Sequence, residues 1–356
     1  GFYEPRCRAH PVPRFLCKVC GRSFSRQTFR ADYYDKRPDL NASVMQAMCD
    51  GVGLRQAASS RGIRRNNLVA KVRKIARHCG RLHHNLMDRF ERAGQPCEFA
   101  LDEAETFEGS RVDRPVTMPV LIHQKTFFVV DAAVGTLPPR RRARRARARQ
   151  HARRRERGKT PARTRERRRS ESRRACAEVL ATAARHCGPA AEVHLRSDLK
   201  STYPRLAREA FGDRLSWHAR ISSKEARGVK NPLHRINLML GVLRDLMGRL
   251  RRRSWLVSKC RHQLKLHLDL HLCYRNYHRR RFSSDPREDT PAVLLGLLPR
   301  PLSLPDILSW RQDWGRECSL HPLSRGRHGV EDFAGLLRAR QLAAAGPGWA
   351  RDGMSA

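Results

Sequence analysis

Residues 97–110 read CEFALDEAETFEGS, and residues 192–198 read EVHLRSD. In the first stretch, apolar residues alternate with small or polar ones up to Asp102, which is the period of a β-strand. The second stretch is also strand-like and closes on another aspartate, Asp198. Both stretches therefore predict strands that end in an acidic side chain facing an open cleft.

The segments around these strands predict the rest of an α/β domain. Residues 117–135 (TMPVLIHQKTFFVVDAAVG) have the pattern of a hairpin of two further strands. The other expected elements are a helix over residues 176–187, a strand over 215–221 and long helices over 232–277. Two aspartates on adjacent strands can share Mg²⁺ ions about 3.5–4 Å apart, and Mg²⁺ prefers such hard oxygen ligands. The alternative is that both are ordinary surface residues.

The chain is strongly basic, with 74 Lys and Arg against 34 Asp and Glu and a net charge of +40. Such a charge repels itself in a compact state unless a polyanion neutralises it, and nucleic acid releases counterions at each basic contact. Residues 140–174 contribute +16, which leaves +24 elsewhere, so the whole chain is expected to bind nucleic acid. Residues 139–175 lack the apolar residues needed for a core and form an arginine-rich insert, which either binds phosphates or reflects compositional drift.

Residues 1–30 contain the sequence CKVC from Cys17 to Cys20, a spacing with which two thiolates bind one zinc ion. Cys7 and His10 are candidates for the two further ligands of a tetrahedral structural site. One alternative is a second Cys-x-x-Cys pair upstream, which would make this a truncated zinc ribbon. Another is that the cysteines are free and buried, as the odd total of 11 Cys favours in a reducing cytoplasm.

Residues 38–80 have the pattern of a helix-turn-helix domain. Glycines separate three helical segments, the small residues Ala57 and Ala58 allow a close helix crossing, and the last segment repeats apolar residues at helical spacing. The helix over residues 65–77 would be the recognition helix in the major groove. Its outer face offers side chains that read bases or hold phosphates: Arg64, Arg65, Asn66, Asn67, Lys71 and Lys74. The alternative is a three-helix core with a solvated basic face.

Taken in order, these motifs resemble the DDE-type transposases of bacterial insertion sequences. FLCKVCGRSFS and LRQAASSRGIRRNNL resemble their zinc-ribbon and helix-turn-helix region, LDEAETFEG the first catalytic aspartate segment, and RSDLKSTYP the second. The helices from NPLHRINLML onward resemble the last catalytic helix and its partner, so the resemblance covers residues 15–315. It implies an RNase H-like fold over residues 95–282, with a five-stranded mixed sheet and flanking helices. It also implies Mg²⁺- or Mn²⁺-dependent strand cleavage and transfer, with Asp102 and Asp198 as metal ligands.

The chain departs from this family at the third acid, which those enzymes usually place on the last helix with a Lys seven residues later. The matching positions are Asn237 and Arg244, which share nearly one helical face because seven residues is close to two turns. Some members of such families use Asn or His there, so Asn237 is expected to offer a neutral oxygen and Arg244 to hold a phosphate. His234, Asp245 and Glu225 are alternative third ligands. A degenerate site is the remaining alternative.

The combined prediction is a DNA transposase that acts on insertion-sequence ends and target DNA as a homo-oligomer in the bacterial cytoplasm, associated with the nucleoid. The first rival is a catalytically inactive DNA-binding relic, and the second is a nuclease or resolvase on the same fold. A basic structural protein is the third. The sequence shows neither a secretory signal nor an apolar run long enough for a bilayer, so no membrane partner is expected. Residues 283–356 are expected to form a partly disordered extension.

Overall fold

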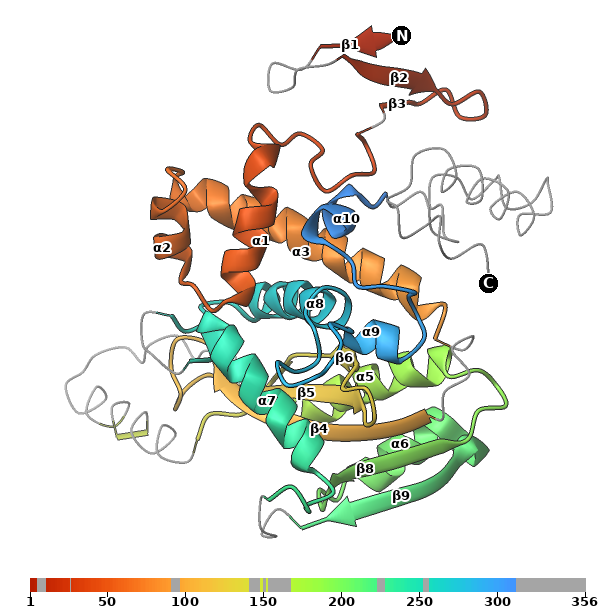
Figure 1. Cartoon of the computed structure of the whole chain (residues 1–356). Helices are drawn as coiled ribbons and strands as arrows, with labels where there is room; N and C mark the ends of the chain where they lie inside the picture. The colour runs from red at the N-terminus through yellow and green to blue at the C-terminus, as the bar shows by residue number, and fades with distance from the viewer. Residues whose placement is uncertain are drawn as a thin grey trace. The chain divides into compact units, whose positions relative to one another are not determined.

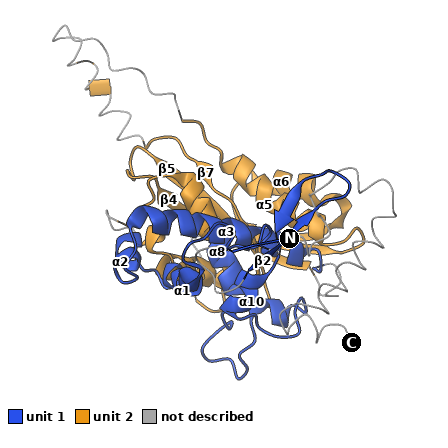
Figure 2. Cartoon of the chain, turned by 90° about the horizontal axis from the view of Figure 1, so that it is seen from above, with its two compact units in different colours: residues 1–94, 269–356 blue, residues 95–268 orange. Residues whose placement is uncertain are grey.

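The structure is a computed structural model that describes residues 1–4, 11–25, 27–90, 97–140, 148–149, 152, 168–222, 228–251 and 256–311. The chain divides into two compact units (Figure 2). Unit 1 comprises residues 1–94 and 269–356, and unit 2 comprises residues 95–268. Unit 2 is shorter than the predicted domain over residues 95–282, because the chain after residue 268 packs with the N-terminal helices. One such contact joins His78 Nε2 and the Ile307 carbonyl oxygen at 2.7 Å.

Unit 1 contains a small antiparallel sheet and a set of helices (Figure 1). The sheet has the order β1 (Phe2–Tyr3), β2 (Val12–Leu16) and β3 (Ser23–Ser25). The helices that follow are η1 (Pro38–Leu40), α1 (Asn41–Cys49), α2 (Leu54–Ser59) and α3 (Arg65–Met87). Later in the chain come the last part of α8 (Arg261–Tyr277), then α9 (Pro291–Leu294) and α10 (Leu304–Ser309).

The helices α1, α2 and α3 pack on one another through the apolar positions that the sequence predicted. Their buried residues include Val44, Met48, Ala57, Ala58, Leu68, Val72 and Ile75. Gly62 takes a φ of +60° in the turn between α2 and α3, a conformation that favours glycine. Helix α3 continues to Met87, well past the predicted end, because Leu82 and Leu86 extend its apolar stripe.

Unit 2 is built on a mixed sheet, which confirms the α/β class. Its strands are β4 (Cys97–Phe107), β5 (Pro115–His123), β6 (Val129–Ala132), β7 (Gly135–Thr136), β8 (Val193–Asp198) and β9 (Leu215–Ile221). Five of them follow the order β6-β5-β4-β8-β9, and β7 pairs with β5. The β4–β5 and β5–β6 pairs are antiparallel, whereas β4–β8 and β8–β9 are parallel. The sheet has six strands where five were expected, because the two-residue β7 adds to it.

Helices contact this sheet from several directions (Figure 1). Helix α5 (Ser172–His186) packs against β5 and β6, and α6 (Tyr203–Phe211) against β8 and β9. Helix α7 (His234–Leu246) packs against β4 and β5. Two 3-10 turns, η3 (Gly212–Arg214) and η4 (Gly248–Leu250), and the first part of α8 complete the unit.

The arginine-rich insert leaves the sheet after β7 and returns into α5. The Glu171 N–H donates to the Thr136 carbonyl at 2.8 Å, and the Thr136 N–H donates to the Glu171 carboxylate at 2.9 Å. The backbones approach so closely that a Cβ on Gly135 would lie 2.9 Å from the Glu171 oxygen. The two ends of the insert are therefore held together, while most of its residues lie outside the described part of the chain.

Candidate active site

Asp102 and Asp198 lie side by side on adjacent parallel strands. Leu101 on β4 pairs with Ser197 on β8, and each is followed by one of the two aspartates. Side chains at matching positions of paired strands point to the same face of a sheet. Asp198 is the last residue of β8, as predicted. The prediction that Asp102 ends its strand is wrong, because β4 continues to Phe107 along β5.

Burial and nearby negative charge both act on the Asp102 carboxyl. Burial is the largest cause that raises its pKa to about 6, and the charges of Asp198 and Glu103 add to the rise. The Glu103 N–H, which donates to Asp102 Oδ1 at 2.7 Å, and the charge of Arg244 act in the opposite direction. Two half-buried carboxylates that repel each other form a site that a cation would stabilise.

Helix α7 brings Arg244 to this pair. Its buried stripe is Ile236, Met239, Leu240 and Leu243. Asn237 and Arg244 are both half-buried and lie seven residues apart, so they share a face of the helix. The charge of Arg244 lowers the pKa of Asp102, so this guanidinium lies within electrostatic range of the acid pair. The candidate site thus combines two carboxylates with a guanidinium whose charge acts on them, and Asn237 lies about two turns away on the same helix.

The alternative third ligands are not gathered at the site in the described residues. The Asp245 side chain is 78 % exposed and faces Arg251 at 3.8 Å. His234 is half-buried at the start of α7, and Glu225 lies outside the described residues. Within the part of the chain that the structure describes, three His, Cys, Asp or Glu residues do not come together anywhere as a metal-binding group. Asn237 as the third ligand therefore stays a prediction, based on its position seven residues before Arg244 on the same helix.

The residue after Asp102, Glu103, points to the opposite face of the sheet and anchors the turn that follows β8. Its carboxylate accepts hydrogen bonds from side chains of five residues: Thr117, Ser172, Cys176, Lys200 and Tyr203. Burial raises the pKa of Glu103, but the hydrogen bonds from Lys200 and Thr117 outweigh it and leave the pKa lowered. The backbone N–H of Lys200 in turn donates to Asp198 Oδ1 at 3.0 Å. Glu103 thus fixes the backbone next to Asp198.

Glu103 is a residue of this region that was not predicted, although the alternation of β4 contains a signal for it. In β4 the residues Phe99 and Leu101 are fully buried, and Glu103 is the next residue of the same alternation. A glutamate in line with buried apolar residues needs a partner, since a buried charge without one is costly. Its neighbour Asp102 belongs to the other phase of the same strand, and the sequence indicated it as the expected end of that strand.

Five of the six residues that were predicted to contact DNA at α3 are exposed to solvent. Arg64, Arg65, Asn66 and Asn67 are all exposed at the start of the helix. Lys74 is exposed too, and its Nζ donates to the Tyr33 carbonyl at 2.9 Å.

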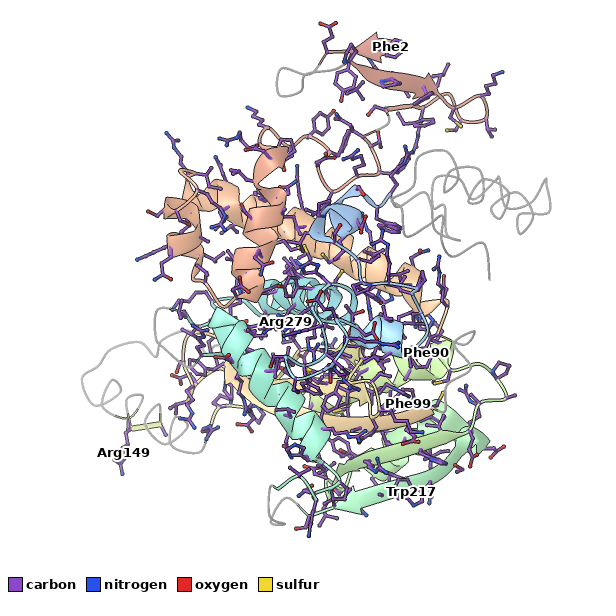
Figure 3. The ribbon with its side chains drawn as sticks, in the orientation of Figure 1. Phe2, Phe90, Phe99, Arg149, Trp217 and Arg279 are labelled. Carbon is purple, nitrogen blue, oxygen red and sulfur yellow. The ribbon has the colours of Figure 1, made fainter. Side chains whose placement is uncertain are left out.

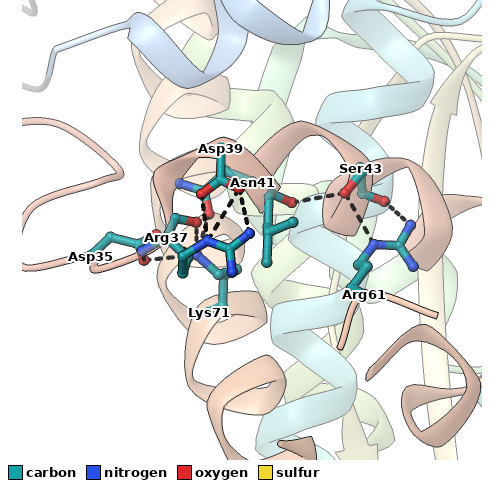
Figure 4. A network of polar contacts seen from close by, with 8 residues as sticks. Asp35, Arg37, Asp39, Asn41, Ser43, Arg61 and Lys71 are labelled. Carbon is teal, nitrogen blue, oxygen red and sulfur yellow. Dashed lines mark hydrogen bonds and ion pairs between the residues drawn. The ribbon is translucent and has the colours of Figure 1, made fainter. Parts of the chain in front are cut away.

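The prediction that Lys71 contacts DNA is wrong. Its side chain is only 7 % exposed and lies 2.6 Å from a carboxylate oxygen of Asp35 (Figure 4). Its ammonium also donates to the Arg37 carbonyl and to Asn41 Oδ1, each at 2.8 Å. All three donors of the ammonium are therefore directed into the protein. Lys71 lies three residues after Leu68, so it falls on the buried side of the helix.

Cys17 and Cys20 lie at the tip of the β2–β3 hairpin. The Gly21 N–H donates to the Cys17 carbonyl at 2.8 Å, and Gly21 has a φ of +67°. Hydrogen bonds from the backbone of Cys20 and Val19 lower the pKa of the Cys17 thiol, which favours a metal-binding thiolate. Both cysteines are free and half-buried. Cys7 and His10 lie outside the described residues, so the zinc site stays a prediction.

Neither a scan against protein-family models nor a search of curated proteins finds a match to this chain. None of the helices in the described part of the chain combines the length and apolar character that a bilayer span requires.

The raised pKa of Asp102 predicts that Asp102→Asn stabilises the metal-free protein. A folded-state pKa of about 6 lies above the ordinary 3.8, so folding loses stability as the pH rises from 3.8 to about 6, and the loss persists above that. One pKa unit is worth about 1.4 kcal/mol and the side chain is half-buried, so we expect a gain of about 1–3 kcal/mol at pH 8. Urea unfolding in EDTA at pH 8 and pH 3.5 measures it. The gain should vanish at pH 3.5, and destabilisation at pH 8 would contradict the assigned burial penalty.

Proposed function

We propose that this chain is a metal-dependent DNA phosphoryl-transfer enzyme of the transposase type. The observation that carries the proposal is the side-by-side placement of Asp102 and Asp198 on adjacent strands of a mixed sheet. Such a sheet with flanking helices is what the RNase H-like expectation requires. The basic charge of the whole chain, +40, supports a polyanionic substrate.

The two carboxylates fit Mg²⁺ or Mn²⁺, because they are hard oxygen donors whose mutual repulsion a divalent cation would relieve. When bound, the metal would activate the attacking oxygen and stabilise the leaving oxygen of a phosphodiester. Asp102 and Asp198 would hold it, and Asn237 would contribute a neutral oxygen. Arg244, whose charge already acts on Asp102, would hold a non-bridging phosphate oxygen.

Helices α2 and α3 support a DNA-binding role for unit 1. They pack on each other across a tight turn, and the exposed Arg64–Asn67 segment opens α3. A helix-turn-helix places the N-terminal residues of its second helix against base edges, which is the role that we propose for this segment. In this proposal the segment recognises transposon ends, the hairpin of Cys17 and Cys20 holds structural zinc, and two copies of the chain join two ends.

A cleavage and strand-transfer assay tests the proposal. The substrate is duplex DNA that carries the sequences flanking the gene, incubated with and without Mg²⁺. Metal-dependent nicking at a defined end, followed by joining to target DNA, is the expected result. Binding without any cleavage would instead favour an inactive relic, for which the Asn at position 237 is the motivating observation. Cleavage of branched DNA without end specificity or joining would favour a nuclease or resolvase.

Substitutions at the start of α3 should separate phosphate contacts from base reading. Arg65→Ala should weaken binding to all duplexes and reduce the slope of log affinity against log salt by about 1. Asn66→Ala should lower discrimination between the end sequence and random DNA by about 1–3 kcal/mol. Fluorescence anisotropy over a salt series measures both. Arg205→Ala on α6 removes an equal charge from an exposed position in unit 2 and is the control. Equal losses in all three variants would rule out α3 as the reading helix.

A further inference from the structure

The acid pair shares its face of the sheet with a tryptophan. Trp217 on β9 pairs with His194 on β8, and Arg196 lies midway between His194 and Asp198 on the same strand. Because alternate residues of a strand and paired residues of neighbouring strands share a face, Trp217, Arg196 and Asp198 all point to one side. Helix α6 packs with the other side, the one that holds Glu103 and Tyr203.

Trp217 is held in place and yet open to solvent. Trp217 lies on β9, the last strand of the β6-β5-β4-β8-β9 path, and the residue is 45 % exposed (Figure 3). The Arg196 guanidinium carbon lies 5.3 Å from the ring centroid, within the range of a cation–π contact. The His194 ring packs edge-on at 5.9 Å. These two contacts orient the indole but leave nearly half of the residue uncovered.

The surroundings of the ring suit a nucleic acid strand. Arg196 lies two residues before Asp198 on β8, and the charge of Arg244 acts on Asp102, so positive charge lies near both acids. At about 3.3 Å per residue, Arg196 lies roughly 7 Å and His194 roughly 13 Å along β8 from Asp198. A stacked strand advances about 3.4 Å per nucleotide, so the ring lies within about four nucleotides of a phosphate at the acid pair. Indole stacks on any base that is not paired, whereas paired bases inside a duplex cannot reach it.

We propose that Trp217 and Arg196 form a stacking platform for an unpaired base of the DNA strand on which the acid pair acts. Trp217 stacks on the base, and Arg196 contacts the neighbouring phosphate. The proposal rests on the proposed function for its substrate, and it adds that the strand is locally single-stranded beside the reacting phosphate. A DNA end with melted or unpaired bases is therefore the preferred substrate over a fully paired one.

Binding measurements in EDTA test the platform separately from catalysis. The probe is a fluorescent ten-nucleotide oligothymidine, compared with a blunt duplex of the same length, at about 0.2 M salt to suppress non-specific charge contacts. Stacking on one aromatic ring is worth about 1–3 kcal/mol, so Trp217→Ala should weaken oligothymidine binding by about 5- to 150-fold. Trp217→Phe should retain most of the affinity, and duplex binding should stay unchanged in both variants.

Two controls make the result decisive. Tyr34→Ala removes another exposed aromatic residue, 82 % exposed in unit 1, and should leave oligothymidine binding intact. Oligothymidine should quench the tryptophan fluorescence of the wild type and quench Trp217→Phe much less. Unchanged oligothymidine affinity in Trp217→Ala overturns the platform, as does an equal loss on duplex. Failure of the cleavage assay with an intact platform would instead count against catalysis alone.

Discussion

Asp198→Asn should lower metal-dependent DNA cleavage by more than about 100-fold while leaving duplex binding intact. Even groups that only support a metal ligand are worth about 10- to 100-fold, so the loss of a direct carboxylate ligand should exceed that range. The fold should survive, because an amide at this position can still accept the 3.0 Å hydrogen bond from the Lys200 N–H. Single-turnover cleavage of end DNA, with anisotropy for binding, measures the two effects on the same samples.

The matched control for this experiment is Asp245→Asn. Asp245 is an acid on α7 whose side chain is 78 % exposed. The Asp245→Asn variant therefore loses the same charge at an exposed position, and it should cleave DNA like the wild type. Cleavage by Asp198→Asn within tenfold of wild type would remove Asp198 from the active site. A loss in Asp245→Asn as large as that in Asp198→Asn would show that net charge, and not ligation, governs the rate.

Lys71→Met should destabilise unit 1 by about 3–5 kcal/mol, the usual cost of removing one partner from a buried ion pair. The substitution keeps the length of the side chain but leaves Asp35, which is 11 % exposed, without its ammonium partner. Burial raises the pKa of Asp35, and the Lys71 hydrogen bond together with the Arg37 N–H outweighs it, so the pKa is lowered. The wild-type contribution is therefore present above the ordinary value of 3.8 and is lost as the pH falls through the lower folded-state pKa.

Urea unfolding at pH 7 and at acid pH measures this loss, and Lys74→Met serves as the control. Lys74 lies on the same helix, is exposed, and makes one hydrogen bond to a backbone carbonyl, so its removal should cost less than about 1 kcal/mol. If Lys71→Met instead weakened DNA binding without lowering stability, the residue would be a DNA contact after all. The difference between the two variants should shrink at acid pH, where Asp35 is protonated.

Local patterns in the sequence were enough to predict most elements of the fold. Alternation predicted β4 and β8, and the 3.6-residue period predicted α3 and a helix in the region of α7. The placement of Asp102 beside Asp198 depends instead on strand register, which is set by pairing across nearly a hundred residues. A single-sequence pattern cannot show that register, although it could suggest that the two strands were partners.

The errors at Asp102 and Lys71 have a common physical origin. Each was judged by residue type and local spacing, which do not reveal what the rest of the chain brings near. The Asp102 strand continues because β5 offers nine partners along it, and Lys71 turns inward because Asp35 and Asn41 lie close by in the folded chain. Glu103 was missed for the same reason, since its five donors come from segments up to 100 residues away.

The chain is held together near both ends of the arginine-rich insert, so the length of the insert should have little effect on the rest of unit 2. Each doubling of the number of residues in a loop adds only about 0.6 kcal/mol of closure entropy. Thr136 and Glu171 hold the chain together near the two ends of the insert, so we expect that a change in the number of residues within the insert leaves the strand register unchanged. The insert is therefore a suitable place at which to introduce a reporter domain or an affinity tag. One residue added within β4, by contrast, would exchange Asp102 and Glu103 between the two faces of the sheet.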